Sequence, residues 1–236
     1  METFLSSNKR ICVIVTSVLI PWDSSPFDYK GLRSVYSVDE RIAQTIETLE
    51  SVKEHLPGSD VIFVEGGRRP DDGVVDMLEK SVRMTHGSRM VFAGKCYMVK
   101  RAVSGKSKAL GEIALMLYVR LFLRKYKYDY FFKISGRYKL NDDFDISKWR
   151  MDKICGKDIY GDETQISTRL LGIPKCMLQR YYFALLRRIW KVPKTSTVLE
   201  GYVLKGIGRE GVCFIRPIGV EGYSASEKKK NCLTKE

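Results

Sequence analysis

Short apolar runs and longer amphipathic segments alternate through residues 10–140. The runs at 11–19 and 60–65 are rich in β-branched residues and continuously apolar, which is typical of strands buried on both faces. A third run lies around 90–94 and a fourth at 129–135. Helical patterns separate these runs, so the sequence predicts right-handed βαβ units that share a mainly parallel sheet.

The helices between these strands carry boundary signals of their own. Ser37 and Glu40 form a capping-box pattern, which predicts that the first helix begins there. A weaker helix is expected over 71–83, and a long, deeply packed helix is expected from Ser104 onward. The connection at 20–36 is long, and loops of that length between regular elements are usually functional or mobile.

The pattern becomes irregular after residue 140. Short strands are expected at 154–160 and 165–172, followed by a helix at 176–191 and a shorter helix around 198–205. A last strand is expected near 212–218. The predicted fold class is therefore α/β, with a Rossmann-like, mixed and mainly parallel central sheet flanked by helices, and an irregular second half.

Composition places these elements in one soluble domain. With 236 residues and 44% hydrophobic side chains the chain can bury one core, which we expect over 1–225, and the polar tail at 223–236 is expected to be disordered. The six cysteines include no CxxC pair, which favours reduced thiols and a cytoplasmic location. The N-terminus lacks the apolar core of a signal peptide, and no run reaches the roughly 18 apolar residues of a membrane span.

The formal net charge of +13 predicts an anionic partner, such as nucleotide phosphates, nucleic acid or an anionic membrane. The two histidines, His55 and His86, disfavour histidine-based metal or triad chemistry. Nucleic-acid binding is one alternative function, although no recognised DNA or RNA module is visible and the basic residues spread along the whole chain. Another Rossmann-like transferase is a further alternative, although no Gly-rich fingerprint follows the first strand and no Walker loop occurs.

The fourth strand ends in small and cationic residues. In α/β proteins, ligands bind outside the carboxyl ends of the central strands. Lys133, Ser135 and Arg137 alternate along the chain and would share one face of an extended strand, opposite Ile134 and Gly136. These three polar groups can therefore converge on one anionic ligand.

The order of elements resembles that of the GT-A glycosyltransferases. The resemblance lies in the first strand ICVIVTS, the capped helix that carries Arg41, the second strand DVIFVEGG, the segment SGKSKALGEIALM and the acidic stretch STVLEGYVLKGI. It covers roughly residues 10–220, and the SGRY at 135–138 is similar to a segment of polysaccharide-building enzymes of microbes and large viruses. The resemblance implies a nucleotide-sugar-binding half over about 10–140 and an acceptor-binding half over about 141–222.

This resemblance implies an enzyme that moves a sugar from a nucleotide-sugar donor to a hydroxyl of a glycan or a lipid-linked glycan. Glu200 has a position similar to that of the family's catalytic base, which would give a single, inverting displacement; alternatively it only complements its helix dipole. Asp162 and Glu163 are expected near the acceptor, with a plain turn as the alternative. The donor is expected to contact Thr16, Ser17, Arg41, Glu65, Lys106, Lys108, Lys133, Ser135, Gly136 and Arg137.

The resemblance fails at the metal motif. In most enzymes of this fold the central strand ends in Asp-x-Asp, which holds a divalent cation against the donor diphosphate. Ser135, Gly136 and Arg137 occupy those positions here, so we expect no metal cofactor, although acids from elsewhere could still recruit one such as manganese. Arg137, Lys133 or Lys139 is expected to neutralise the leaving phosphate instead.

Two further features carry alternative interpretations. A literal Asp-x-Asp occurs at Asp143-Phe144-Asp145 in a predicted polar loop, where acidic residues are usually solvated. The helix segment at 178–194 combines aromatic and basic residues and could contact an anionic membrane or a lipid diphosphate. Its alternative is an amphipathic core helix with a solvated basic side. No nucleic-acid partner is expected if the glycosyltransferase interpretation holds.

Overall fold

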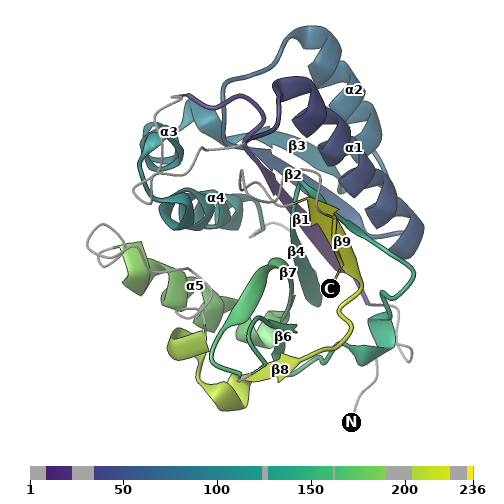
Figure 1. Cartoon of the computed structure of the whole chain (residues 1–236), viewed down its shortest axis with the longest axis vertical. Coiled ribbons are helices and arrows are strands. Elements are labelled where there is room, and N and C mark those ends of the chain that lie inside the picture. Colours follow the sequence, from purple (N-terminus) through teal and green to yellow (C-terminus); the bar gives the residue numbers. More distant parts are fainter. Residues whose placement is uncertain are drawn as a thin grey trace.

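A seven-stranded sheet forms the centre of the molecule (Figure 1). The structure, a computed structural model, describes residues 9–22, 35–123, 127–161, 163–189, 204–223 and 233–235. The strands of the sheet follow the order β3-β2-β1-β4-β7-β6-β8. In chain order they are β1 (Ile11–Ser17), β2 (Asp60–Glu65), β3 (Arg89–Phe92), β4 (Tyr130–Ser135), β6 (Ile154–Asp158), β7 (Ile166–Pro174) and β8 (Val212–Phe214).

The sheet is mixed and mainly parallel, as the sequence predicts. The strands β3, β2, β1 and β4 run parallel to one another, whereas β7 is antiparallel to both β4 and β6, and β8 is parallel to β6. The register places Thr16 beside Ser135 and Ser17 beside Glu65. The carboxyl ends of β1, β2 and β4 therefore meet at one edge of the sheet, where α/β proteins bind ligands.

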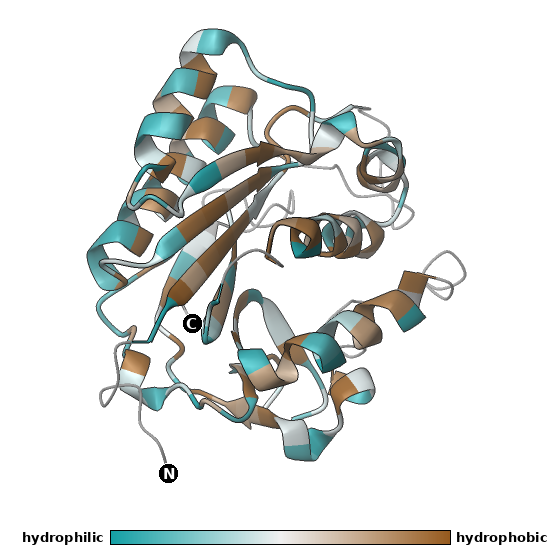
Figure 2. Ribbon diagram, turned by 180° about the vertical axis from the view of Figure 1, so that it is seen from behind, coloured by the Kyte–Doolittle hydropathy of each residue, from teal (hydrophilic) through white to brown (hydrophobic). Residues whose placement is uncertain are grey.

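Helices cover both faces of the sheet (Figure 1). One face carries α1 (Val38–His55) and α2 (Asp72–Val82), and the other carries α3 (Tyr97–Ser104), α4 (Lys108–Leu123) and α5 (Lys175–Ile189). Each face has its own apolar core, with Leu49 and Leu78 on the first side and Ile113 and Tyr181 on the second. Figure 2 shows hydrophobic strands in the middle of the sheet and hydrophilic turns on the outer side of the α1 face.

The first two helices begin where the sequence predicts. The Ser37 hydroxyl accepts a hydrogen bond from the Glu40 backbone N–H at 3.1 Å, and the Glu40 carboxylate accepts the Ser37 N–H at 2.6 Å. The predicted capping box is therefore confirmed. The Asp71 carboxylate accepts the Val74 N–H at 2.9 Å, and each such cap typically contributes about 1 kcal/mol to helix stability.

The long helix expected from Ser104 onward is present as α4, but it begins only at Lys108, and a separate short helix that was not predicted, α3, precedes it. The helix α3 ends at Ser104, and Gly105 has extended backbone angles that interrupt the helix. The Ser107 hydroxyl then accepts the Leu110 N–H at 3.4 Å as α4 begins at Lys108. Short 3₁₀ turns occur elsewhere, at η2 (Ala93–Lys95), η3 (Ile146–Lys148) and η5 (Arg209–Gly211).

The C-terminal part differs from the sequence prediction in two respects. Of the strand expected at 212–218, only residues 212–214 form one, β8, and a separate strand, β9, begins after Gly219, whose φ of 76° is in the left-handed region. The expected disorder of the tail is wrong for its last described residues, because these form a strand on the edge of a second sheet, of order β10-β9-β5. An edge strand offers unpaired N–H and C=O groups, which explains this pairing. The strands of this sheet are β5 (Tyr138–Leu140), β9 (Val220–Tyr223) and β10 (Leu233–Lys235).

The predicted helix at 198–205 falls mostly outside the described residues, and residues 204–207 form a helical turn. Within the described ranges, no helix combines the length and the apolar character needed to cross a bilayer.

Candidate functional site

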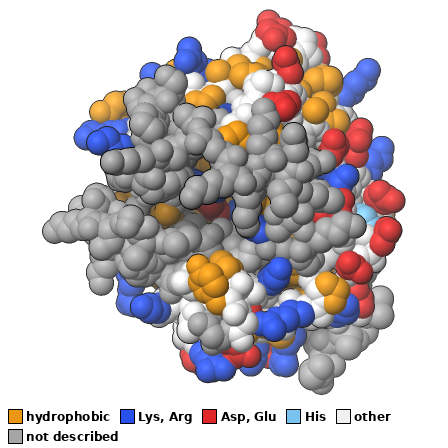
Figure 3. Space-filling view, in the orientation of Figure 1, with side chains coloured by type: hydrophobic (Ala, Val, Ile, Leu, Met, Phe, Trp, Pro, Cys, Tyr) orange, Lys and Arg blue, Asp and Glu red, His pale blue; other side chains and the backbone are white. Residues whose placement is uncertain are grey.

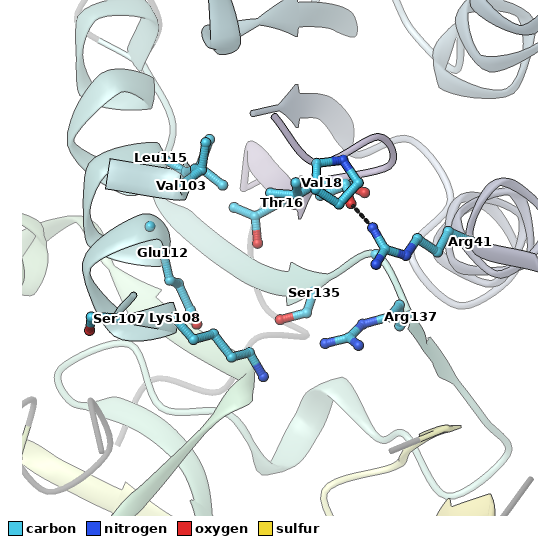
Figure 4. A pocket seen from close by; sticks show the side chains of 14 residues that line it. Thr16, Val18, Arg41, Val103, Ser107, Lys108, Glu112, Leu115, Ser135 and Arg137 are labelled. Atoms are coloured by element: carbon cyan, nitrogen blue, oxygen red, sulfur yellow. Dashed lines mark hydrogen bonds between the residues drawn. The ribbon is translucent and has the colours of Figure 1, made fainter. Parts of the chain in front are cut away.

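A cavity opens at the carboxyl ends of β1 and β4, between α1 and α4 (Figure 4). Its volume is about 140 Å³. The end of α3 and the start of α4 form one wall, which includes Val103, Ser107 and Glu112. Seven of the residues predicted to contact a donor line it: Thr16, Ser17, Arg41, Lys108, Ser135, Gly136 and Arg137.

The turn that follows β4 is held by backbone contacts to its neighbours. The Gly136 N–H donates to the Thr16 carbonyl oxygen at 2.9 Å, and the Gly136 carbonyl accepts from the Thr45 hydroxyl at 2.9 Å. A Cβ at Gly136 would lie 3.2 Å from the Thr45 hydroxyl oxygen and 3.3 Å from the Ser17 Cβ, so only glycine fits without displacement. The turn therefore fixes the position from which the Arg137 side chain enters the cavity (Figure 4).

Arg41 brings a second guanidinium into the cavity. Its Nη1 donates to the carbonyl oxygens of Val18 and Leu19, each at 2.9 Å, and the residue is 8% exposed. Burial, and to a smaller extent the positive charge of Arg137, lower the pKa of Arg41 to about 10. Arg41 thus stays cationic at neutral pH, and the two guanidiniums give this side of the cavity a strong positive potential.

Glu65 lies behind the cavity and does not line it. Its Oε1 accepts the backbone N–H of Leu19 at 3.0 Å and that of Gly67 at 2.6 Å. Burial raises the pKa of Glu65 to about 7, and the two backbone hydrogen bonds and the charge of Arg41 oppose this shift. Glu65 therefore orders the segment after β1 that holds Arg41, whereas the sequence analysis expected it to contact the donor.

Lys133 also lies beneath the cavity wall. Its side chain is fully buried, and its ammonium donates to the Glu112 carboxylate, to the Ser135 hydroxyl at 3.0 Å and to the Thr168 carbonyl oxygen. The contact with Ser135 agrees with the expectation that Lys133 and Ser135 share one face of the strand. All three ammonium hydrogens are used by these contacts, so Lys133 orients Glu112 and Ser135 and has none left for a phosphate.

Glu112 lines the cavity, and sequence analysis did not single it out. It is the lone charged residue in the otherwise apolar stretch ALGEIALML. A charge at a single position of a deeply packed helix needs a partner, because burying an unpaired carboxylate is costly. That requirement was the signal in the sequence that could have identified Glu112.

Other predicted site residues lie elsewhere. Lys106 is not among the residues that line the cavity. Lys139 lies between Glu47 and Glu221, at 3.6 Å from each carboxylate. Glu163, at a φ of 57°, forms an ion pair with Arg209. The predicted base Glu200 and the predicted acceptor residue Asp162 fall outside the described residues.

The residues of the Asp-x-Asp sequence at 143–145 take part in local capping and packing contacts. The Asp145 carboxylate accepts from the Ser147 N–H at 2.9 Å and the Ser147 hydroxyl at 2.6 Å, which lowers its pKa, and it caps η3. The Phe144 ring packs 5.8 Å from that of Trp149. Asp143 lines a separate groove beside α1, on the side where Figure 3 shows acidic side chains gathering. Within the described part of the chain, no group of three or more His, Cys, Asp or Glu side chains could hold a metal ion.

The basic, aromatic helix α5 packs largely as a core helix. Tyr181, Tyr182 and Leu185 are buried against the face of the sheet that carries α4. Phe183 is 57% exposed and Leu186 is 37% exposed. The helix thus fits the amphipathic-core interpretation, with an additional apolar strip on its outer side.

The fold matches that of solved glycosyltransferases. Apo GlyE of Streptococcus pneumoniae TIGR4 gives a TM-score of 0.53 at 10% identity, over 89% of this chain and 46% of GlyE. The bifunctional glycosyltransferase WbbM gives 0.51 at 11% identity, over 90% of this chain and 40% of WbbM. A glycosyltransferase involved in glycosylation of the major capsid of PBCV-1 gives 0.50 at 10% identity, over 88% of this chain and 82% of that enzyme. This chain thus spans less than half of GlyE and of WbbM.

No protein-family model and no curated protein sequence matches the chain. The structural likeness nevertheless confirms the predicted fold class: the protein has the GT-A type of glycosyltransferase fold, with a Rossmann-like, mainly parallel sheet.

Proposed function

We propose that the protein is a glycosyltransferase that moves a sugar from a nucleotide-sugar donor to a hydroxyl of a glycan or a lipid-linked glycan. One observation carries this proposal: Arg41 and Arg137 enter the same cavity at the carboxyl ends of β1 and β4, in a glycosyltransferase fold. Planar guanidiniums bind phosphate oxygens in pairs of parallel hydrogen bonds. The donor diphosphate is the anion that this pair would bind.

The residues of the cavity do not fit a divalent metal ion. A hard cation such as Mg²⁺ or Mn²⁺ requires several oxygen ligands, usually including carboxylates. The cavity offers one carboxylate, Glu112, which is already paired with Lys133, and its other charged residues are Lys108, Arg41 and Arg137. A metal ion would be repelled by these cations. We therefore propose that side-chain cations replace it.

The proposed reaction is a direct displacement. The acceptor hydroxyl oxygen forms a bond to the anomeric carbon, and the bond from that carbon to the phosphate oxygen breaks with its electron pair. Arg137, assisted by Arg41, stabilises the charge that develops on the leaving diphosphate. Glu200 takes the proton of the hydroxyl as general base, and a single displacement of this kind inverts the anomeric centre.

The cavity would hold only a portion of the donor. Ligand clefts usually measure about 300–1,000 Å³, which exceeds the 140 Å³ of this cavity. We assign the cavity to the diphosphate and the sugar, with the nucleoside extending toward the β1 side. Glu163, with Asp162, remains our candidate for acceptor binding.

The outer surface of α5 bears on where the enzyme meets its acceptor. Phe183 and Leu186 form an exposed apolar strip on α5, next to the exposed cations Arg180 and Arg187. Apolar and basic side chains together favour contact with an anionic lipid surface. We therefore propose a cytoplasmic enzyme that contacts the membrane peripherally when its acceptor is lipid-linked.

A thermal-shift screen tests the function. The full chain is heated with UDP, GDP, CDP and dTDP and their sugar derivatives, with and without manganese, and with an oligonucleotide as the competing ligand. We expect stabilisation by one nucleotide family, of similar size with and without manganese, because a ligand that binds only the folded state raises its stability. Stabilisation by the oligonucleotide with none by any nucleotide would refute the proposal.

A further inference from the structure

The cavity presents different chemistry on its two sides. Figure 4 shows Arg41 and Arg137 on one side and Glu112, which comes from α4, on the other, with Ser135 between them. Lys108 extends from the same helix toward the middle of the cavity (Figure 4). The wall formed by α4 therefore contains a carboxylate within a cavity whose remaining charges are positive.

The Glu112 carboxylate is held in one orientation from below. Lys133 is fully buried and donates to Glu112 Oε1, whereas the Glu112 side chain is 17% exposed. Among the described residues, Glu112 Oε2 accepts no hydrogen bond. One carboxylate oxygen is thus tied to a buried counter-ion, and the other is available to a ligand in the cavity.

A role in packing alone does not account for this arrangement. A buried ion pair contributes little to stability beyond what apolar side chains of the same volume would provide. Lys133 also fixes Ser135, the residue at the carboxyl end of β4 that lines the cavity. Two of the three partners of the buried ammonium, Glu112 and Ser135, therefore line the cavity.

We propose that Glu112 selects the donor sugar by charge. This inference rests on the proposed function: with the diphosphate at Arg41 and Arg137, the attached sugar extends toward α4. There the free oxygen of Glu112 accepts a hydrogen bond from a sugar hydroxyl or N–H group, and a bond to an ionised acceptor is stronger than one to a neutral acceptor. The site takes neutral sugars and amino sugars.

The same carboxylate excludes acidic sugars. A uronate places a second carboxylate beside Glu112, and two like charges brought together in a partly buried site repel each other. Neither carboxylate has a proton to donate. The repulsion gives the enzyme specificity against uronates without requiring additional contacts to the preferred sugar.

The experiment compares two donors that differ in one group. The nucleoside diphosphate that binds is identified first among UDP, GDP and dTDP. The wild-type chain is then titrated calorimetrically with the neutral hexose derivative of that nucleotide and with its uronate, such as UDP-glucose and UDP-glucuronate. We expect the neutral donor to bind at least about tenfold more tightly than the uronate.

Two variants show whether Glu112 causes this preference. Glu112→Gln removes the negative charge and leaves Lys133 without its counter-ion, so the double variant Glu112→Gln/Lys133→Met removes both charges in case the single variant fails to fold. In either folded variant we expect the preference for the neutral donor over the uronate to fall to about threefold or less. The affinity for the free nucleoside diphosphate should change by less than about threefold. The control is Glu79→Gln, on the exposed surface of α2, which should keep the wild-type preference.

The outcomes separate the two proposals. If no nucleoside diphosphate binds, the proposed function fails and this inference fails with it. If the diphosphate binds and the wild-type chain takes both donors equally, only the inference is overturned. It is also overturned if the folded double variant keeps the full preference for the neutral donor.

Discussion

The Thr45 hydroxyl on α1 donates a hydrogen bond to the Gly136 carbonyl oxygen, with 2.9 Å between the two oxygens. This bond joins a helix to the turn that follows β4 across 91 positions of sequence. Together with the bond from Gly136 N–H to Thr16, it fixes the turn on two sides. The position of Arg137 in the cavity depends on both contacts.

Gly136→Val should therefore damage the site by displacing the turn that positions Arg137. A Cβ there would press against Thr45 and Ser17, and overpacking of this kind costs about 1–3 kcal/mol of stability. The displaced turn should also weaken nucleoside diphosphate binding about tenfold or more. Urea unfolding and calorimetric titration measure the two effects. The control is Gly73→Ala, where a Cβ would meet only the Asp71 carboxylate at 3.4 Å. It should change neither the stability nor the nucleotide affinity by much. If both substitutions had equal effects, the turn at Gly136 would not be what positions Arg137.

Arg137→Ala should weaken binding of the nucleoside diphosphate about 10- to 100-fold, because hydrogen bonds to charged groups contribute about 1.5–3 kcal/mol. Arg137→Lys should recover part of the affinity, since a point charge remains but the planar fork is lost. Isothermal titration with and without manganese provides the measurement. The double variant Asp143→Asn/Asp145→Asn is the control and should bind normally. If that control loses more nucleotide affinity than Arg137→Ala does, the result would indicate a metal ion bound at Asp143 and Asp145.

Glu65 should make stability depend on pH. Its folded-state pKa, raised to about 7 by burial, lies above the ordinary value of 4.5, so the folded protein holds the proton more tightly than the unfolded chain. The contribution of the protonated group is complete below pH 4.5 and is lost as the pH rises through 7, with a total on the order of 3 kcal/mol.

Glu65→Gln should remove this dependence. The amide oxygen can still accept from the backbone N–H groups of Leu19 and Gly67, but it does not titrate. Urea unfolding from pH 4.5 to 7 should show the wild type losing stability relative to the variant as the pH rises. Parallel curves would mean that Glu65 ionises normally in the folded state. Glu79→Gln is the exposed control, and its curve should follow the wild type.

Glu200→Gln should reduce transfer about 10²- to 10⁴-fold, the usual contribution of a general base, with little change in donor affinity. Product formation is measured with the nucleotide sugar and acceptor found by screening, and donor affinity by calorimetry. A variant that transfers at the wild-type rate would move the role of base to Glu163 or Asp162, each of which is then replaced in turn.

The sequence predicted the fold well where local signals and burial agree. The apolar runs that became β1, β2 and β4 and the capping box at Ser37 all appear in the structure. The short helix α3 was missed because eight residues give little periodic signal, and the break at Gly105 could not be distinguished from a glycine tolerated within a helix.

The candidate site was predicted only in part, because side-chain direction depends on packing between distant elements. Periodicity placed Lys133 and Ser135 on one face, and they do share it, but it could not show that Thr168 on β7 and Glu112 on α4 would enclose the ammonium. Lys139 was expected at the site and instead lies between two carboxylates near α1, because β5 begins after the turn and pairs with β9. Glu112 was missed since a helix that is apolar nearly all round does not reveal which side borders a cavity.

The break between α3 and α4 also affects the electrostatics of the site. Because α4 begins at Lys108, its first turn borders the cavity. The aligned peptide dipoles of a helix amount to roughly half a positive charge at its N-terminus. A continuous helix through Gly105 would carry that partial charge back to the start of α3 at Tyr97. By interrupting the helix, Gly105 brings a source of positive potential to the cavity that requires no ionisable side chain and is therefore independent of pH.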